Sequence, residues 1–130
     1  MAHKEIQVSF YRREFTREDW RYSIDEKALD DFLRGLAAEL DRFGIRLSHG
    51  REDSVTIQVG GYTDLLNAVR LRSPHDGFGN LCLGHVIGAS PNRDLFEDIR
   101  RGVNRIAFAP ETVEPEGSSK VVCHNCGCGC

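Results

Sequence analysis

Long apolar runs are absent from this chain of 130 residues, and so is a clear excess of charge of one sign. No stretch approaches the ~20 apolar residues needed to span a bilayer, so we expect no membrane partner. Seventeen basic residues against twenty acidic ones give a net charge of −3, which argues against nucleic acid as a partner. Small basic groups occur only at 12–13, 70–72 and 100–101, and we expect them on solvated faces.

Several functional motifs are also missing. The first residues, Met1 to Val8, lack the apolar stretch of a secretory signal, so we expect a cytoplasmic protein. No Gly-x-Gly-x-x-Gly joins a predicted strand to a helix, and no serine lies in a nucleophile-elbow sequence. Dinucleotide binding and serine-hydrolase chemistry are therefore not predicted.

Cysteine is scarce over most of the chain, where only Cys82 occurs before residue 123. The other four of the five cysteines lie in the last eight residues, where they could staple little of a fold together. The cytoplasm is reducing, and an odd count leaves one thiol unpaired. We therefore do not expect a disulfide framework.

Strands are predicted where apolar residues alternate with polar ones, as they do in 6–10 and 55–59. Short apolar stretches are the second signal, although Gly84 weakens it at 81–87. The strands expected on these grounds cover 6–10, 45–47, 55–59, 81–87 and 103–108, with a polar turn at 48–53 and a loop at 73–80.

Helices are predicted where apolar residues recur every three or four positions. The longest stripe runs from Leu29 to Phe43, behind a capping box with Ser23 as the cap and Glu26 three residues on. Gly44 follows as the left-handed stop. Two further helices are expected, one at 63–71 and one from Ser90-Pro91 to Gly102.

This order of elements indicates an α/β or α+β fold, a small mixed sheet with about three helices. The compact domain is expected to span 1–109. An acidic segment rich in proline, glycine and serine follows at 110–122 and is typical of a flexible tether. The chain then ends in a cysteine-rich tail at 123–130.

The tail has the composition of a site for metal or thiol chemistry. A thiolate binds soft metals and also attacks disulfides, so clustered cysteines suit either use. A Cys-x-x-Cys pair lets two sulfurs face one ion, and the intervening glycines would let the last two sulfurs converge on it. The predicted ligands are Cys123, His124, Cys126, Cys128 and Cys130.

The metal and the complete ligand set stay open at this point. Structural zinc usually takes two ligand pairs from separated segments, whereas crowded Cys-x-Cys sequences suit Cu(I) or an iron–sulfur cluster at least as well. A second pair could come from Cys82 and His85, three residues apart in the body. The alternative is that Cys82 is a small buried hydrophobe and His85 a hydrogen-bonded core histidine.

The stretch 121–128 resembles the Cys-x-x-Cys-x-Cys claw of nitrile hydratase α subunits. In that family three sulfurs and two backbone amides hold low-spin iron or cobalt, and two of the sulfurs are oxidised. The resemblance implies Cys123, Cys126 and Cys128 as ligands, with a backbone nitrogen from Gly127. It covers about eight of the 130 residues; Gly127 stands where serine is usual, and Cys130 is an additional sulfur.

These patterns predict a small metal-binding accessory protein, which delivers or completes a metal site on a partner enzyme or assembly factor. Two alternatives stay open. The tail could be a swinging thiol arm that relays sulfur or a disulfide, with Cys123 attacking and Cys126 resolving. It could also be the core of a ribosomally made, modified peptide with 1–119 as the leader.

Overall fold

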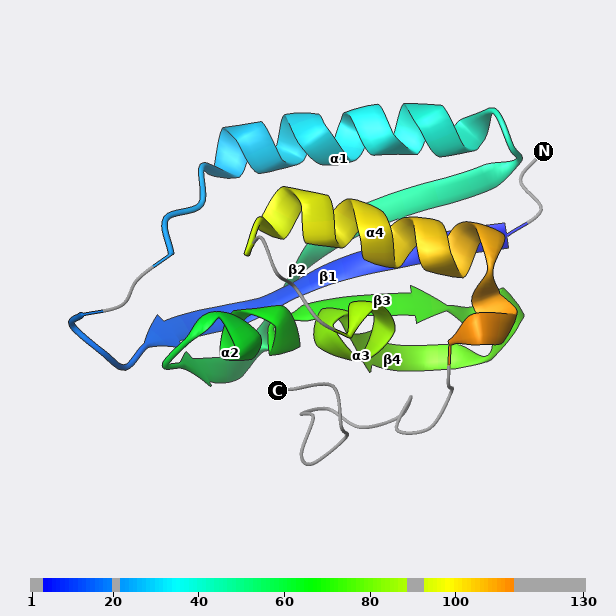
Figure 1. Ribbon diagram of the computed structural model, residues 1–130. Helices are drawn as coiled ribbons and strands as arrows, with labels where there is room; N and C mark the ends of the chain where they lie inside the picture. The colour runs from blue at the N-terminus through cyan, green and yellow to red at the C-terminus, as the bar shows by residue number, and fades with distance from the viewer. Residues whose placement is uncertain (1–3, 20–21, 89–92, 114–130) are drawn as a thin grey trace.

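The computed structural model describes residues 4–19, 22–88 and 93–113, which form a mixed four-stranded sheet covered by helices (Figure 1). This confirms the predicted fold class. No helix in these ranges is both long and apolar enough to cross a membrane. The strands are β1 (Lys4–Phe15), β2 (Ile45–Val59), β3 (Val69–Ser73) and β4 (Phe78–Cys82). The helices are α1 (Glu26–Asp41), α2 (Tyr62–Asn67), α3 (Leu83–Ile87) and α4 (Leu95–Phe108), with 3-10 turns η1 (Pro74–Asp76) and η2 (Pro110–Thr112).

The sheet has the order β2-β1-β3-β4, so β2 and β4 are its edge strands. β1 pairs in parallel with β2, from Lys4 opposite Ile45 to Phe15 opposite Val59. Helix α1 provides the crossover that such a parallel pair requires. β3 is antiparallel to β1, and β4 is antiparallel to β3.

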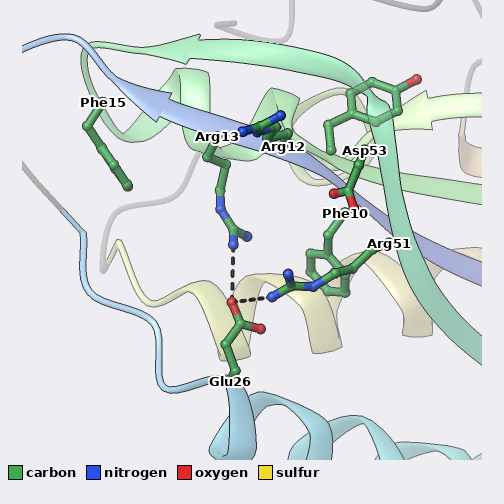
Figure 2. Close-up of a pocket in the computed structure, with 8 residues that line it drawn as sticks. Phe10, Arg12, Arg13, Phe15, Glu26, Arg51 and Asp53 are labelled. Atoms are coloured by element: carbon green, nitrogen blue, oxygen red, sulfur yellow. Dashed lines mark hydrogen bonds and ion pairs between the residues drawn. The ribbon is translucent and has the colours of Figure 1, made fainter.

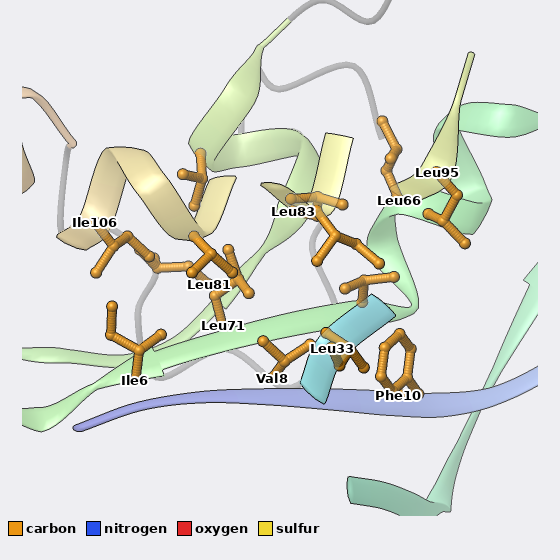
Figure 3. Close-up of a cluster of buried hydrophobic side chains, with 14 of the residues drawn as sticks. Ile6, Val8, Phe10, Leu33, Leu66, Leu71, Leu81, Leu83, Leu95 and Ile106 are labelled. Atoms are coloured by element: carbon orange, nitrogen blue, oxygen red, sulfur yellow. The ribbon is translucent and has the colours of Figure 1, made fainter. Parts of the chain in front are cut away.

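The main core lies between the sheet and the helices (Figure 3). Ile6 and Val8 of β1 are fully buried there, and Phe10 is 6% exposed. Helices α1 and α4 lie side by side. The rings of Phe32 in α1 and Phe96 in α4 stack with their centroids 5.1 Å apart. Each fully buried aliphatic side chain contributes about 1.5–3 kcal/mol, so this layer holds the sheet and the two long helices together.

Helix α1 begins two residues later than the capping box predicts. Asp25 is the cap, and its Oδ1 accepts hydrogen bonds from the N–H groups of Lys27 and Ala28 at 3.0 and 3.2 Å. The prediction that Ser23 is the cap is wrong. The physical reason is that Ile24 packs against the core, which leaves the helix to start beyond it.

The rest of the prediction for α1 is confirmed by its buried leucines, Leu29, Leu33, Leu36 and Leu40. Gly44 has a φ of 74°, so the left-handed stop is confirmed as well. Phe43, which the pattern includes in the buried stripe, lies beyond the helix and is 61% exposed.

Strand β2 is continuous, so the polar turn predicted at 48–53 is wrong. Polar residues fit there because β2 is an edge strand with solvent beside it, and β1 pairs with it along its length. The pairing shifts register once, where Tyr11 lies opposite Glu52 and Arg12 opposite Thr56. The chain therefore bulges at 53–55 without ending the strand.

The segment 63–87 differs from its prediction in three places. The helix predicted at 63–71 ends at Asn67, because Val69–Ser73 pairs with both β1 and β4 as β3. The loop predicted at 73–80 is shorter, because Gly77, with a φ of 81°, lets the chain turn back so that Phe78 already pairs with Ser73. The strand predicted at 81–87 ends at Cys82, and its second half is α3.

Helix α4 runs through Gly102, where a helix end was predicted, and includes 103–108, which was predicted as a strand. Both predictions are wrong. Its cap is Asp94, whose side chain accepts from the Glu97 N–H at 3.3 Å, and the predicted start at Ser90-Pro91 lies outside the described residues. The buried residues that continue the helical period past the glycine are Val103, Ile106 and Ala107.

Candidate functional site

The five predicted metal ligands of the tail, Cys123, His124, Cys126, Cys128 and Cys130, lie outside the described residues. Their convergence on one metal therefore stays a prediction. Within 4–19, 22–88 and 93–113, no group of three or more histidine, cysteine or acidic side chains is placed to hold a metal ion.

Cys82, the predicted body ligand, is the last residue of β4 and the cap of α3. Its Sγ accepts a hydrogen bond from the His85 N–H at 3.3 Å, and the residue is 2% exposed. Burial raises the pKa of the thiol, although the His85 N–H and the nearby Arg70 charge act in the opposite direction. Cys82 is therefore a neutral thiol at neutral pH, the form that binds metals and attacks disulfides least.

His85 lies in α3, one turn after Cys82, and is only partly buried. The structure thus brings Cys82 and His85 together through the backbone N–H of His85. Of the predicted body pair, His85 is the more accessible member. The small-hydrophobe interpretation of Cys82 is the one that its burial favours.

Residues 110–113 pack against the body, although the composition places the tether at 110–122. Arg105 of α4 donates from Nε to Thr112 Oγ1 at 3.0 Å and from Nη2 to Thr112 O at 2.7 Å. Its Nη1 donates to Val86 O at 2.5 Å. Val113 is 6% exposed. One guanidinium therefore joins the last described residues to α3, next to His85, and we call Pro110–Val113 the tail root.

A groove between α1 and the strands β1 and β2 was not predicted (Figure 2). Its first part is a cavity of about 300 Å³, lined among others by Phe10, Phe15, Arg12, Arg13, Glu26 and Arg51. Its second part is a cavity of about 250 Å³, lined among others by Phe10, Glu26, Leu29, Leu33, His49 and Arg51. Phe10, Glu26 and Arg51 line both cavities, so the two parts lie next to each other.

An ion-pair cluster lies at the middle of the groove. Oε1 of Glu26 accepts from Nη2 of Arg51 at 2.8 Å and from Nη2 of Arg13 at 3.3 Å (Figure 2). Farther along, His49 Nε2 and Asp30 Oδ1 are 2.9 Å apart. Charged groups from β1, α1 and β2 thus meet between the two cavities.

Arg70 was also not predicted as a buried residue, and its expected place on a solvated face is wrong. It is 1% exposed, its guanidinium lies 4.9 Å from the centroid of the Tyr11 ring, and its Nη2 donates to Asn67 Oδ1. Burial lowers its pKa, but arginine stays charged in proteins. Because β3 is a central strand, the neighbouring side chains cover this residue.

The groove carries no sequence signal of its own. Arg13, Glu26 and Arg51 come from three elements and are far apart along the chain. The basic pair at 12–13 was expected on a solvated face, and Glu26 was assigned to a capping box. The parallel pairing of β1 with β2 brings the two arginines together, and the packing of α1 adds Glu26.

Comparison with known protein families, curated protein sequences and solved structures gives no match for this chain. No residue role is therefore transferred from another protein.

Proposed function

We propose that this protein is a small metal-binding accessory protein. The tail at 123–130 binds a thiophilic metal ion or an iron–sulfur cluster, and the α/β body docks on the partner that receives or supplies it. The observation that carries the proposal is the distribution of thiols. Four of five cysteines occupy the last eight residues, whereas the fifth, Cys82, is 2% exposed in the body.

The state of the Cys82 thiol is unfavourable for metal binding. Metal binding needs the thiolate, so it is favoured where the thiol loses its proton easily. Burial raises the pKa of Cys82 and keeps its proton on. The tail adds an imidazole at His124 and the claw spacing of Cys123, Cys126 and Cys128, which suits Zn, Cu(I), Fe or Co.

The position of the tail root supports a body contribution from His85. Arg105 contacts both Thr112 and Val86, so the tail root lies beside the residue that follows His85. A partly buried imidazole at this place is a suitable additional ligand for a metal held by tail thiolates.

Mass spectrometry of the full chain, purified without oxygen from its own host, tests the proposal. We expect a mass excess under native conditions that disappears in acid and identifies the metal. A variant with all four tail cysteines changed to serine should lose the excess. The matched control, Cys82→Ala, should keep it, because Cys82 is buried and neutral.

Other results would contradict metal binding and select an alternative. An apo mass with permanent covalent changes confined to 123–130 would identify a modified peptide precursor. An apo mass with an unmodified tail, whose cysteine pair interconverts reversibly between dithiol and disulfide, would identify the thiol relay. Retention of the metal by the variant without tail cysteines would place the site elsewhere in the chain.

A further inference from the structure

We propose that the segment 114–122 folds back over the face of the sheet opposite the helices, where Glu114 or Glu116 pairs with the buried guanidinium of Arg70. The inference does not use the tail thiols, so it stands whether or not the tail binds metal. It rests on three observations: the burial of that face, the charge of Arg70, and the position of the tail root.

The four helices pack on one face of the sheet. α1 and α4 lie on the same side of it (Figure 1). α4 faces the sheet at Gly102, where a Cβ would lie 3.2 Å from Cδ1 of Leu71 and 2.5 Å from Cδ1 of Leu83 in α3. α2 is joined to α4 by the hydrogen bond that Tyr62 Oη donates to Asp98 Oδ2 at 2.5 Å. No helix in the described ranges is therefore left to cover the opposite face.

That opposite face carries a cluster of polar side chains around Arg70. Side chains alternate along a strand, so Arg70 points away from the helices that Leu71 faces. Cys82 of β4 lies opposite Arg70 in the register. The Arg70 guanidinium lies 4.9 Å from the centroid of the Tyr11 ring, and Asn80 Nδ2 donates to Tyr11 Oη at 3.0 Å. These contacts place the four side chains on one face.

The Arg70 cluster is buried although no described helix covers it. The exposed fraction is 1% for Arg70, 2% for Tyr11 and Cys82, and 8% for Asn80. Side chains on one face of a sheet shield one another from the sides, but their outer ends are buried only when a further layer packs on them. The structure contains a single chain, so we infer that residues of this chain outside the described ranges supply that layer.

The charge of Arg70 specifies what that layer contains. Nη2 of Arg70 donates to the neutral Asn67 Oδ1, and its Nε has no hydrogen-bond partner among the described residues. Glu52 of β2 is already paired with Arg72 at 2.8 Å. A buried charge is costly without a partner of opposite charge, and a carboxylate matches a guanidinium best. The covering layer should therefore bring a carboxylate to Arg70.

The tail root lies close to this face. Arg105 contacts Val86 O and Thr112 O with two nitrogens of one guanidinium. Val86 follows Cys82 by about one turn of α3, and Cys82 lies one strand away from Arg70. At the usual helical rise and strand spacing, the path from Val86 to Arg70 is roughly 11 Å. The chain that leaves the tail root therefore starts beside the face that needs a cover.

The segment after the tail root has the required charge. Glu114 and Glu116 are its first two acidic residues. Three extended residues span about 10 Å, so Glu116 lies within reach of Arg70 when the chain turns toward it after Val113. Attachment at the tail root also gives the segment a high effective concentration at this face, which a second copy of the chain does not have.

Nuclear magnetic resonance with a spin label tests the position of the segment in the full chain. The four tail cysteines are changed to serine, which removes the proposed metal ligands, and Ser118→Cys carries the label. Cys82 is buried, so mass spectrometry should find a single label. We expect the label to broaden the amide signals of 70–72 and 80–82 much more than those of α1, which lies on the other face.

A mixed sample separates the chain's own segment from that of a second copy. Spin-labelled protein without isotopes is added to isotopically labelled protein without a spin label. We expect no broadening at 70–72 in this sample, because the segment of each chain already covers its own sheet.

The rate at which iodoacetamide alkylates Cys82 tests the ion pair. Cys82 is the single thiol once the four tail cysteines are serine. In this background, the double variant Glu114→Gln and Glu116→Gln should be alkylated about tenfold faster, because loss of the pair with Arg70 raises the population in which the face is open.

Glu111→Gln is the matched control, since Glu111 is an exposed acidic residue of the tail root. It should leave the alkylation rate unchanged. Circular dichroism and thermal unfolding of each variant show whether the fold is kept.

Three outcomes would overturn the proposal. One is broadening that is absent, or equal at 70–72 and in α1, which would show a segment that does not settle on this face. Another is broadening at 70–72 in the mixed sample, which would assign the cover to a second copy. The third is equal alkylation of Cys82 with and without the two glutamates, which would remove them as the partners of Arg70.

Discussion

Gly102 lies in the interior of α4, where glycine is less favourable than alanine by roughly 0.5–1 kcal/mol. Its place is explained by what lies against it. A Cβ at this position would lie 2.5 Å from Cδ1 of Leu83 and 3.2 Å from Cδ1 of Leu71. Both leucines are fully buried, so neither can move away into solvent. The glycine lets α4 approach α3 and the sheet.

Gly102→Ala should therefore lower the free energy of unfolding by about 1–2 kcal/mol, because the overpacking outweighs the better helix propensity. Gly35→Ala in α1 is the matched control, since a Cβ there meets nothing within 4 Å. It should raise the free energy of unfolding by up to about 1 kcal/mol. Urea unfolding of both variants measures the difference, and equal stabilisation by both would contradict the close packing at Gly102.

Individual residues were predicted well where the local sequence determines the conformation. Gly44 follows a long amphipathic stripe, and its positive φ follows from that position. Gly102 also follows an apolar stripe, but its role depends on Leu83, which belongs to another helix, α3. Arg70 is buried because β3 is central in the sheet, which the residue's own neighbours in sequence do not show.

At the scale of elements, the long helix α1 and the first strand were predictable, because their periods are regular over many residues. The errors occur where an apolar stretch is short or tertiary pairing decides. The stretch 103–108 is apolar enough for a strand, but Val103 and Ile106 continue the spacing of Leu95 and Ile99. Pairing with β1 likewise makes the polar stretch 48–53 part of β2.

The candidate sites divide in the same way. The cysteine tail could be predicted because its ligands are adjacent in the sequence, and it stays a prediction. The burial of Cys82 follows its apolar surroundings in the sequence. The groove could not be predicted, because its arginines become neighbours only when β2 lies parallel to β1.

Arg105 gives a prediction for the link between α4, α3 and the tail root. Arg105→Gln should lower the free energy of unfolding by about 1–2 kcal/mol, since it removes charge-assisted hydrogen bonds to Thr112 and Val86. Hydrogen exchange is the sharper measurement. The amides of Thr112 and Val113, which bond to Ala109 O and Pro110 O, should exchange about tenfold faster.

The control for this experiment is Arg42→Gln, an exposed arginine just beyond α1. It should leave exchange at Thr112 and Val113 unchanged. Unchanged exchange in the Arg105 variant itself would show that the packing of Val113 alone holds the tail root.

At the scale of the whole molecule, one lysine near the start of β1 joins three elements that are far apart in the sequence. Lys4 Nζ donates to Asp76 Oδ2 at 2.9 Å and to Ile106 O at 2.7 Å, so it joins β1, η1 and α4. Burial acts to raise the pKa of Asp76, but the hydrogen bonds from Ser73 and Lys4 outweigh it, and the pKa lies below the usual value.

This direction predicts how stability depends on pH. A carboxyl whose pKa is lower in the folded state stabilises the fold above its unfolded pKa of about 3.9 and loses that contribution as pH falls through the folded value. Asp76→Asn should cost about 1–2 kcal/mol at pH 7, and its difference from the unchanged protein should shrink below about pH 4. Urea unfolding from pH 7 to pH 3 measures this, with exposed Asp31→Asn as the control. A difference that is constant with pH would contradict the linkage.

Because β1 is a central strand, the fold should resist a pulling force more strongly at Lys4 than at Val113. β1 is bonded to a strand on each side, so force applied along it at Lys4 must shear many hydrogen bonds at once. Force applied at Val113 reaches Arg105 first and then α4, whose turns open one after another. An unfolding machine that pulls on the chain therefore meets far less resistance from the tail root than from Lys4.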